Sequence, residues 1–233
     1  EVGRSIDPDE YPQEFQKAKT YIALHNVYGV DLNPTAVELA EVSLWLDTMA
    51  RGLKAPWFGL RLRSGNSLIG ARHAVYSAST VEKAKPKDRM GQAPDRIPLS
   101  QSPAGQGIFH FLLPASGWGA AGGNNEIKKL APEPAKDLRD WTKRVAAKPN
   151  KSQVKELVSL TERIQYLWGI AERRMIEAER QSRRSIDVWE AEVPAGGEVT
   201  REEIERSLRE SNSAYRRLRL VMDAWCALWF WPV

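Results

Sequence analysis

The sequence predicts an α/β fold, with part of a doubly wound sheet followed by a long loop and an α-helical hairpin. Two short apolar runs, at 27–31 and 60–63, flank a helical pattern, which gives the order strand, helix, strand. A stretch without proline from 151 to 192 then predicts a long helix. These patterns and the charge distribution divide the chain into regions 1–80, 81–150 and 151–233.

The first region, 1–80, contains the predicted strands. The run 27–31 is apolar and ends on the carboxylate of Asp31, which is typical of a buried strand. Asn33 is followed by proline, and this pair predicts a helix that begins with Asn33 as its N-cap. The second strand, at 60–63, runs into the polar turn Ser64-Gly65-Asn66-Ser67. A parallel strand–helix–strand unit is therefore expected here.

The second region, 81–150, is expected to be a basic, proline-rich connection. It carries 12 basic and 7 acidic side chains and more than half of the 14 prolines, and this composition favours loops over regular structure. Within it, the apolar run 108–114 predicts a short strand or a buried plug.

The third region, 151–233, is expected to form an antiparallel helical hairpin. Apolar residues at helical spacing follow the long helix, and Pro-Ala-Gly-Gly at 194–197 ends the pattern. Thr200 and Glu203 have the spacing of a capping box, which opens a second helix expected to continue through Met222. Two long helices joined by a short turn pack side by side.

Composition limits the class of protein. A hydrophobic fraction of 42% excludes a disordered tail, and the single cysteine, Cys226, excludes an internal disulfide and suits the cytoplasm. No apolar run is long enough for a membrane span, and scattered histidines predict no metal site. The first residues lack a signal peptide and an initiator methionine, and the last ten are rich in tryptophan. We therefore expect an internal fragment of a larger cytoplasmic protein, with its apolar C-terminus packed against further structure.

Polar residues at the ends of the two strands form the candidate site. Parallel strands present their carboxyl ends at one edge, where α/β sheets bind ligands. Asp31 is placed to accept hydrogen bonds from ribose hydroxyls, Leu32 to lie on a purine, and Asn66-Ser67 to read an adenine edge. These groups predict an adenosine-containing cofactor. The alternative is that Asp31 and Asn33 form a turn that caps the helix, and that Asn66 serves its own loop.

The residues 28–40, 43–46 and 64–70 read YGVDLNPTAVELA, SLWL and SGNSLIG. They resemble the class I S-adenosylmethionine-dependent adenine-specific (N6) DNA methyltransferases of type IIG restriction–modification and of the BREX and DISARM phage-defence systems. The resemblance implies a Rossmann-like sheet and S-adenosyl-L-methionine as cofactor. It also implies that Asp31 holds the ribose hydroxyls, that Leu32 packs on the adenine, and that Asn66, beside Ser67, bonds the adenine edge.

The sequence departs from this family at two motifs. The glycine-rich DPAxGSG motif and the catalytic NPPY or NPPW motif are absent, so no catalytic residue is assigned and this chain alone is not expected to methylate DNA. The resemblance implies double-stranded DNA as a partner, together with the remainder of the polypeptide or other defence-system subunits.

The hairpin offers a second functional hypothesis. Antiparallel pairing would bring together arginines that can hold DNA phosphates, namely Arg173, Arg174, Arg180, Arg216, Arg217 and Arg219. Nearby glutamates leave open a solvated helix face without this role, and the basic loop 81–150 is a competing DNA contact. The alternative to an enzyme is a non-catalytic helical DNA- or protein-interaction module of a larger defence complex.

Overall fold

The computed structural model describes residues 6–49, 58–83, 92–103, 105, 107–182, 201–210 and 213–230. Its mixture of helices and two small sheets agrees with the predicted α/β class. The chain divides into two compact units, Glu1–Ile69 with Glu172–Arg209, and Gly70–Ala171 with Glu210–Val233. This division differs from the three consecutive regions expected, because helix α7 (Lys151–Ser182) contributes to both units.

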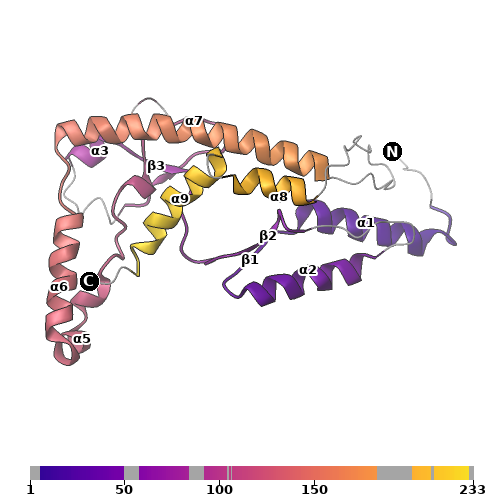
Figure 1. Ribbon diagram of the computed structural model, residues 1–233, viewed down its shortest axis with the longest axis horizontal. Coiled ribbons are helices and arrows are strands. Elements are labelled where there is room, and N and C mark those ends of the chain that lie inside the picture. Colours follow the sequence, from indigo (N-terminus) through magenta and orange to yellow (C-terminus); the bar gives the residue numbers. More distant parts are fainter. Residues whose placement is uncertain are drawn as a thin grey trace. The chain divides into compact units, whose positions relative to one another are not determined.

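The first unit contains a parallel strand–helix–strand motif (Figure 1). Its elements in chain order are α1 (Tyr11–Asn26), β1 (Gly29–Asp31), α2 (Pro34–Thr48) and β2 (Leu62–Ser64). Strands β1 and β2 pair in parallel, with Gly29 opposite Leu62 and Asp31 opposite Ser64. The predicted order of strand, helix and strand is confirmed, although both strands begin two residues later than the sequence pattern indicated.

Helix α2 starts where the sequence predicted and covers the sheet. The Asn33 side chain accepts a hydrogen bond of 3.0 Å from the backbone N–H of Thr35, which satisfies a helix N-terminal donor. One face of α2 packs on the apolar cluster of the first unit, which consists of Ala23, Phe58 and Leu62 with Leu24, Val27, Val37, Ala40 and Leu44 around it. Burial of this face holds the helix against the strands.

A buried arginine connects the last part of α7 to the sheet. Arg61 precedes β2 and is only 7% exposed. Its Nη1 donates a hydrogen bond of 2.8 Å to the carbonyl of His25 at the end of α1, and its Nη2 pairs with the carboxylate of Glu179. The guanidinium also lies 4.7 Å from the ring centre of Tyr28. Helix α8 (Arg201–Arg209) belongs to the same unit.

The second unit is built on a three-stranded antiparallel sheet. Its central strand is β3 (Ala74–Ser77), with β4 (Asp95–Arg96) on one side and β5 (Gly107–Phe109) on the other. The strand predicted over 108–114 is therefore only partly correct. The chain leaves the sheet after Phe109 and continues as the 3-10 turn η1 (His110–Leu112), so that its apolar side chains enter the core from a turn.

Helices occupy much of the region expected to be a loop. They are α3 (Ala78–Lys83), the short 3-10 turn η2 (Ala120–Gly123), α5 (Asn125–Leu130) and α6 (Pro132–Val145). The expectation of a long connection over 81–150 is wrong at 125–145. Pro132 stands in the first turn of α6, where a backbone N–H has no helical partner, so this proline starts a helix instead of excluding one.

The second helix of the expected hairpin is divided. Helix α8 ends at Arg209, and α9 (Ala214–Ala227) begins after Ser213. The Ser213 side chain accepts a hydrogen bond of 3.2 Å from the backbone N–H of Arg216, which makes it the N-cap of a new helix. The expected continuous helix from Thr200 through Met222 is therefore wrong on this point.

The tryptophan-rich C-terminus packs largely within the second unit. Its core consists of Val75, Phe109, Phe111, Trp118, Ile164, Ala171, Ala214, Leu218 and Trp225. Trp229 packs against this cluster, whereas Phe230 is exposed. The expectation that this end covers structure outside the chain is thus corrected for Trp225 and Trp229. Among the described helices, none has the length and apolar character needed to cross a membrane.

Candidate functional site

The candidate site lies at the carboxyl ends of β1 and β2 in the first unit. Asp31 ends β1, and its register partner Ser64 ends β2. The backbone N–H of Gly65 then donates a hydrogen bond of 2.8 Å to the carbonyl of Asp31. The structure therefore brings the turn containing Asn66 directly beside Asp31, as the parallel arrangement predicted.

Asp31 forms the local turn that the sequence left open as an alternative. Its Oδ1 accepts a hydrogen bond of 2.8 Å from the backbone N–H of Asn33, which in turn caps α2. The side chain is exposed, and no described residue donates a hydrogen bond to Oδ2. The turn thus fixes the direction of the carboxylate and leaves one of its oxygens to accept hydrogen bonds from a ligand.

Asn66 also stabilises its own loop. Its Oδ1 accepts hydrogen bonds from the backbone N–H groups of Leu68 at 2.8 Å and Ile69 at 3.0 Å. Two donors to the same oxygen fix the orientation of the amide, because Nδ2 cannot accept them. The sequence predicted a side chain that offers both a donor and an acceptor, but in this turn only the N–H groups of Nδ2 remain for a ligand.

Two exposed leucines flank these polar groups in the sequence. Leu32 follows Asp31 and is 73% exposed, and Leu68 follows the turn and is 88% exposed. Apolar side chains beside a few polar groups are typical of sites that bind ring systems. Ser67 is exposed in the same turn, and its role in binding stays a prediction.

Sequence reasoning did not single out Arg63, the residue of β2 opposite Val30. Its Nη2 is buried, and no described residue accepts a hydrogen bond from it. An arginine within a short strand is not distinctive as a sequence pattern, so nothing in the sequence marked it. Its buried donor adds a positive charge to the strand that leads to the candidate site.

The arginines predicted to bind DNA fall into the two different units. Arg173 and Arg174 are exposed on the part of α7 that belongs to the first unit. In the second unit, the exposed arginines of α9 are Arg216, Arg217 and Arg219, and the Nε of Arg219 lies 3.2 Å from a carboxylate oxygen of Asp223. The side chain of Arg180 lies outside the described residues. The joint arginine cluster stays a prediction.

Titratable groups with shifted pKa values lie in the second unit. Burial, together with the positive charge of Arg72, lowers the pKa of His110 to about 4. Its Nε2 accepts a hydrogen bond of 2.8 Å from the backbone N–H of Arg72. A nitrogen that accepts carries no proton, so this hydrogen bond requires the neutral ring. Burial raises the pKa of the Cys226 thiol, which disfavours a thiolate nucleophile. The described residues contain no cluster of ligands that could hold a metal ion.

Comparison with known proteins finds a partial relative. The chain is 38% identical over 66 residues to a putative type II restriction enzyme and methyltransferase of Methanocaldococcus jannaschii. The match covers 24% of this chain and 6% of that protein, so the chain corresponds to a small part of its relative. No family model and no solved structure matches the chain. The chain is thus similar, over part of its length, to a restriction–modification methyltransferase.

Proposed function

We propose that this chain is a segment of an S-adenosyl-L-methionine-dependent DNA methyltransferase of a restriction–modification or phage-defence system, specific for adenine N6. The observation that carries the proposal is the contact between Gly65 and Asp31, which aligns two polar strand ends at one edge of a parallel sheet. The similarity to a protein named as a restriction enzyme and methyltransferase supports the same class of function.

The residues present fit the adenosine part of the cofactor. Oδ2 of Asp31 accepts hydrogen bonds from the two ribose hydroxyls, while its Oδ1 keeps the turn to Asn33. The exposed Leu32 side chain packs on the adenine ring. Asn66 donates to the adenine edge through Nδ2, because its Oδ1 is engaged by the loop. When bound, S-adenosyl-L-methionine supplies a methyl group attached to a positively charged sulfur.

The whole enzyme needs groups that this sequence does not contain. The motif that holds a flipped adenine, NPPY or NPPW, is not present in the chain. In our proposal, this segment holds the cofactor's adenosine, and the remainder of the polypeptide or other subunits contribute the catalytic centre. Double-stranded DNA is the substrate, and its target base must leave the duplex before methylation.

Cofactor binding by the full-length protein tests the proposal. Asp31→Asn keeps an oxygen for the turn but replaces the free acceptor by an N–H donor. We expect the affinity for S-adenosyl-L-methionine, measured by calorimetry, to fall at least about tenfold, since a charged hydrogen-bond acceptor is lost. Asn33→Ala is the matched control, because it removes the helix cap without touching the free oxygen. Unchanged affinity in Asp31→Asn would overturn the assignment.

A further inference from the structure

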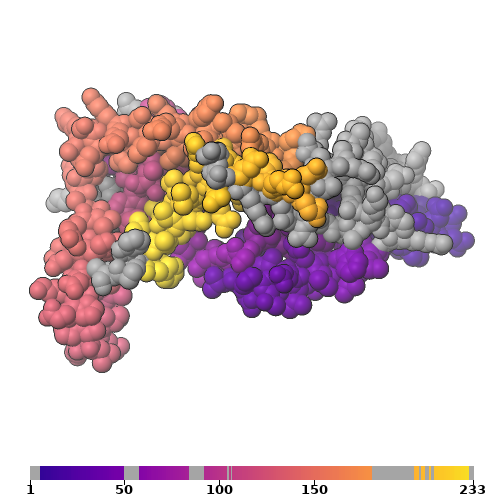
Figure 2. Space-filling view, viewed as in Figure 1, coloured from indigo at the N-terminus to yellow at the C-terminus, as the bar shows by residue number. Residues whose placement is uncertain are grey.

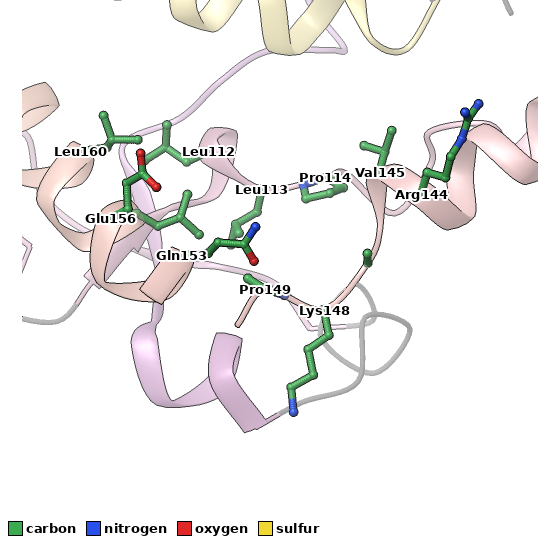
Figure 3. Close-up of a pocket in the computed structure, with 12 residues that line it drawn as sticks. Leu112, Leu113, Pro114, Arg144, Val145, Lys148, Pro149, Gln153, Glu156 and Leu160 are labelled. Atoms are coloured by element: carbon green, nitrogen blue, oxygen red, sulfur yellow. The ribbon is translucent and has the colours of Figure 1, made fainter. Parts of the chain in front are cut away.

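The second unit contains a cavity of about 320 Å³ that the cofactor proposal does not use (Figure 3). It is open to solvent, and three segments line it: the residues at the end of η1, the end of α6 with the linker after it, and the first turns of α7. Its lining consists of Leu112, Leu113, Pro114, Arg144, Val145, Ala147, Lys148, Pro149, Gln153, Glu156, Leu157 and Leu160.

The floor of the cavity is apolar. Leucine, valine and proline side chains from all three segments form it. Cavities that bind small molecules begin at about 300 Å³, so this one suits a single ring system with a small substituent. A flat ring that lies on this floor removes apolar surface from water.

Two polar side chains from α7 lie among the leucines in the cavity, namely Gln153 and Glu156 (Figure 3). Oε1 of Gln153 accepts a hydrogen bond of 2.9 Å from the backbone N–H of Asn150, and Oδ1 of Asn150 accepts one of 2.9 Å from the N–H of Gln153. This reciprocal cap leaves Nε2 of Gln153 as a donor. Glu156, one turn further on, is an acceptor when ionised.

A donor and an acceptor on one side of a helix select the edge of the ligand. The complementary edge has an acceptor next to an amine, as in cytosine with N3 and N4 or adenine with N1 and N6. Thymine also presents an acceptor next to a donor, because its N3–H lies between O2 and O4. The pair Gln153 and Glu156 can therefore hydrogen-bond the edge of a nucleobase, without selecting one base over another.

The rim of the cavity is positively charged. Residues 141–155 contain five basic side chains and no acidic one: Lys143, Arg144, Lys148, Lys151 and Lys155. Arg144 and Lys148 line the cavity, and their side chains extend outward from it in Figure 3. Helix α6, which carries Arg144, lies at the surface in Figure 2. Lys143 pairs with Asp140, and Lys151 lies 3.9 Å from a carboxylate oxygen of Glu82, so a phosphate outside the cavity has Arg144 and Lys148 as its nearest cations.

We propose that this cavity binds one unpaired nucleotide of a DNA strand, with its base against the leucines and its phosphates on Arg144 and Lys148. The combination of an apolar floor, a base-reading pair and a basic rim matches the three chemical parts of a nucleotide. A fully paired duplex keeps the edges and faces of its bases inside the double helix, so its bases cannot enter the cavity. The choice of DNA as the nucleic acid rests on the proposed function; the pocket chemistry itself does not.

Binding of labelled oligonucleotides to the 233-residue chain, without cofactor, tests this inference by fluorescence anisotropy. The probes are twelve-residue strands of deoxycytidine and of thymidine, a cytidine strand of RNA, and a DNA duplex of the same length. We expect both single DNA strands to bind at least about fivefold more tightly than the duplex. Glu156→Gln should reduce the preference for single strands over duplex, because the carboxylate that accepts hydrogen bonds from a base edge is lost.

Charge variants separate the cavity from general electrostatic attraction. Arg144→Glu with Lys148→Glu should weaken binding at least about tenfold and reduce the salt slope by about 1.4, since each phosphate contact on a single strand contributes about 0.7. The control is Lys129→Glu with Lys136→Glu, which changes the charge equally on exposed residues that do not line the cavity. This control should alter affinity far less.

Ala147→Trp fills the cavity without changing charge and should remove the preference for single strands while leaving the salt slope intact. Thermal unfolding checks that each variant folds, and Glu156→Gln tests the site without adding volume. Equal binding of duplex and single strand, or equal losses from the cavity and control variants, would overturn the proposal. Preferential binding of the RNA strand would overturn DNA as the ligand. Unchanged cofactor affinity in Asp31→Asn, which would overturn the cofactor assignment, leaves these outcomes unaffected.

Discussion

The indole N–H of Trp225 donates a hydrogen bond of 2.9 Å to the backbone carbonyl of Leu113, across 112 residues of sequence. Both groups are buried, so the bond satisfies polar atoms that water does not reach. It attaches α9 to the segment that follows η1. The same segment forms part of the floor of the cavity proposed to bind a nucleotide. The bond therefore helps to hold α9 in the second unit.

Trp225→Phe should lower the stability of the second unit more than Trp229→Phe. The first change leaves the carbonyl of Leu113 buried without its donor, at a cost of about 1–3 kcal/mol beyond the lost packing. The second removes an indole N–H that is buried but has no partner among the described residues. Urea unfolding of both variants, followed by near-UV circular dichroism, measures the difference. Equal losses would show that the hydrogen bond contributes no net stability.

Acid should destabilise the protein through His110. Its pKa falls from 6.5 to about 4 on folding, so the unfolded chain binds a proton that the folded one excludes. Stability from this group is complete above pH 6.5 and is lost as the pH falls toward 4, by up to about 3 kcal/mol. Unfolding free energies of wild type and His110→Gln, measured between pH 7.5 and 4.5, should diverge in that window. Parallel pH profiles of the two unfolding free energies would contradict a lowered pKa of His110.

Gly117→Ala should displace an aromatic ring. A Cβ atom at this position would overlap the six-membered ring of Trp229, and overpacking of this kind costs about 1–3 kcal/mol. Gly123→Ala is the matched control, since a Cβ there meets no atom within 4 Å. Thermal unfolding of the two variants compares them directly. A stability of Gly117→Ala equal to that of the control would mean that Trp229 moves without cost.

Arg61→Ala should destabilise the first unit by about 1–3 kcal/mol, because it removes the hydrogen bond to the carbonyl of His25 and the ion pair with Glu179. Glu179→Gln keeps an acceptor for the guanidinium and should cost less. Hydrogen exchange of the amides in β1 and β2 reports local stability there. Greater loss of protection in Glu179→Gln than in Arg61→Ala would refute this order.

Local signals allowed the first unit to be predicted well. Asn33 before a proline is a strong helix start, and the run ending at Asp31 forms the expected strand. The prediction that this strand is buried is wrong, because Val30 is 50% exposed. Composition misled the prediction at 125–145, where Pro132 begins a helix, and near Ser213, whose capping role depends on the break between α8 and α9. Composition alone does not distinguish a proline in the first turn of a helix from one in a loop.

The candidate sites show the same limit at the level of side chains. The sequence predicted that Asp31 and Asn66 meet, because parallel strands align their ends. It did not predict which side-chain oxygens accept hydrogen bonds within the turns, since that depends on the backbone direction after each strand. The nucleotide cavity was not predicted at all, because segments around Leu113, Lys148 and Gln153 meet only through tertiary packing.

The loop hydrogen bonds of Asn66 have a consequence for analogue selectivity. With Oδ1 engaged by Leu68 and Ile69, this side chain presents donors alone to the proposed cofactor. Such a side chain can donate a hydrogen bond to a ring nitrogen of the purine, but it cannot accept one from the exocyclic amine. An S-adenosylmethionine analogue with a purine lacking the 6-amino group should therefore retain its affinity, whereas a 1-deaza analogue should lose it, a pattern opposite to that of a carboxylate in the same place.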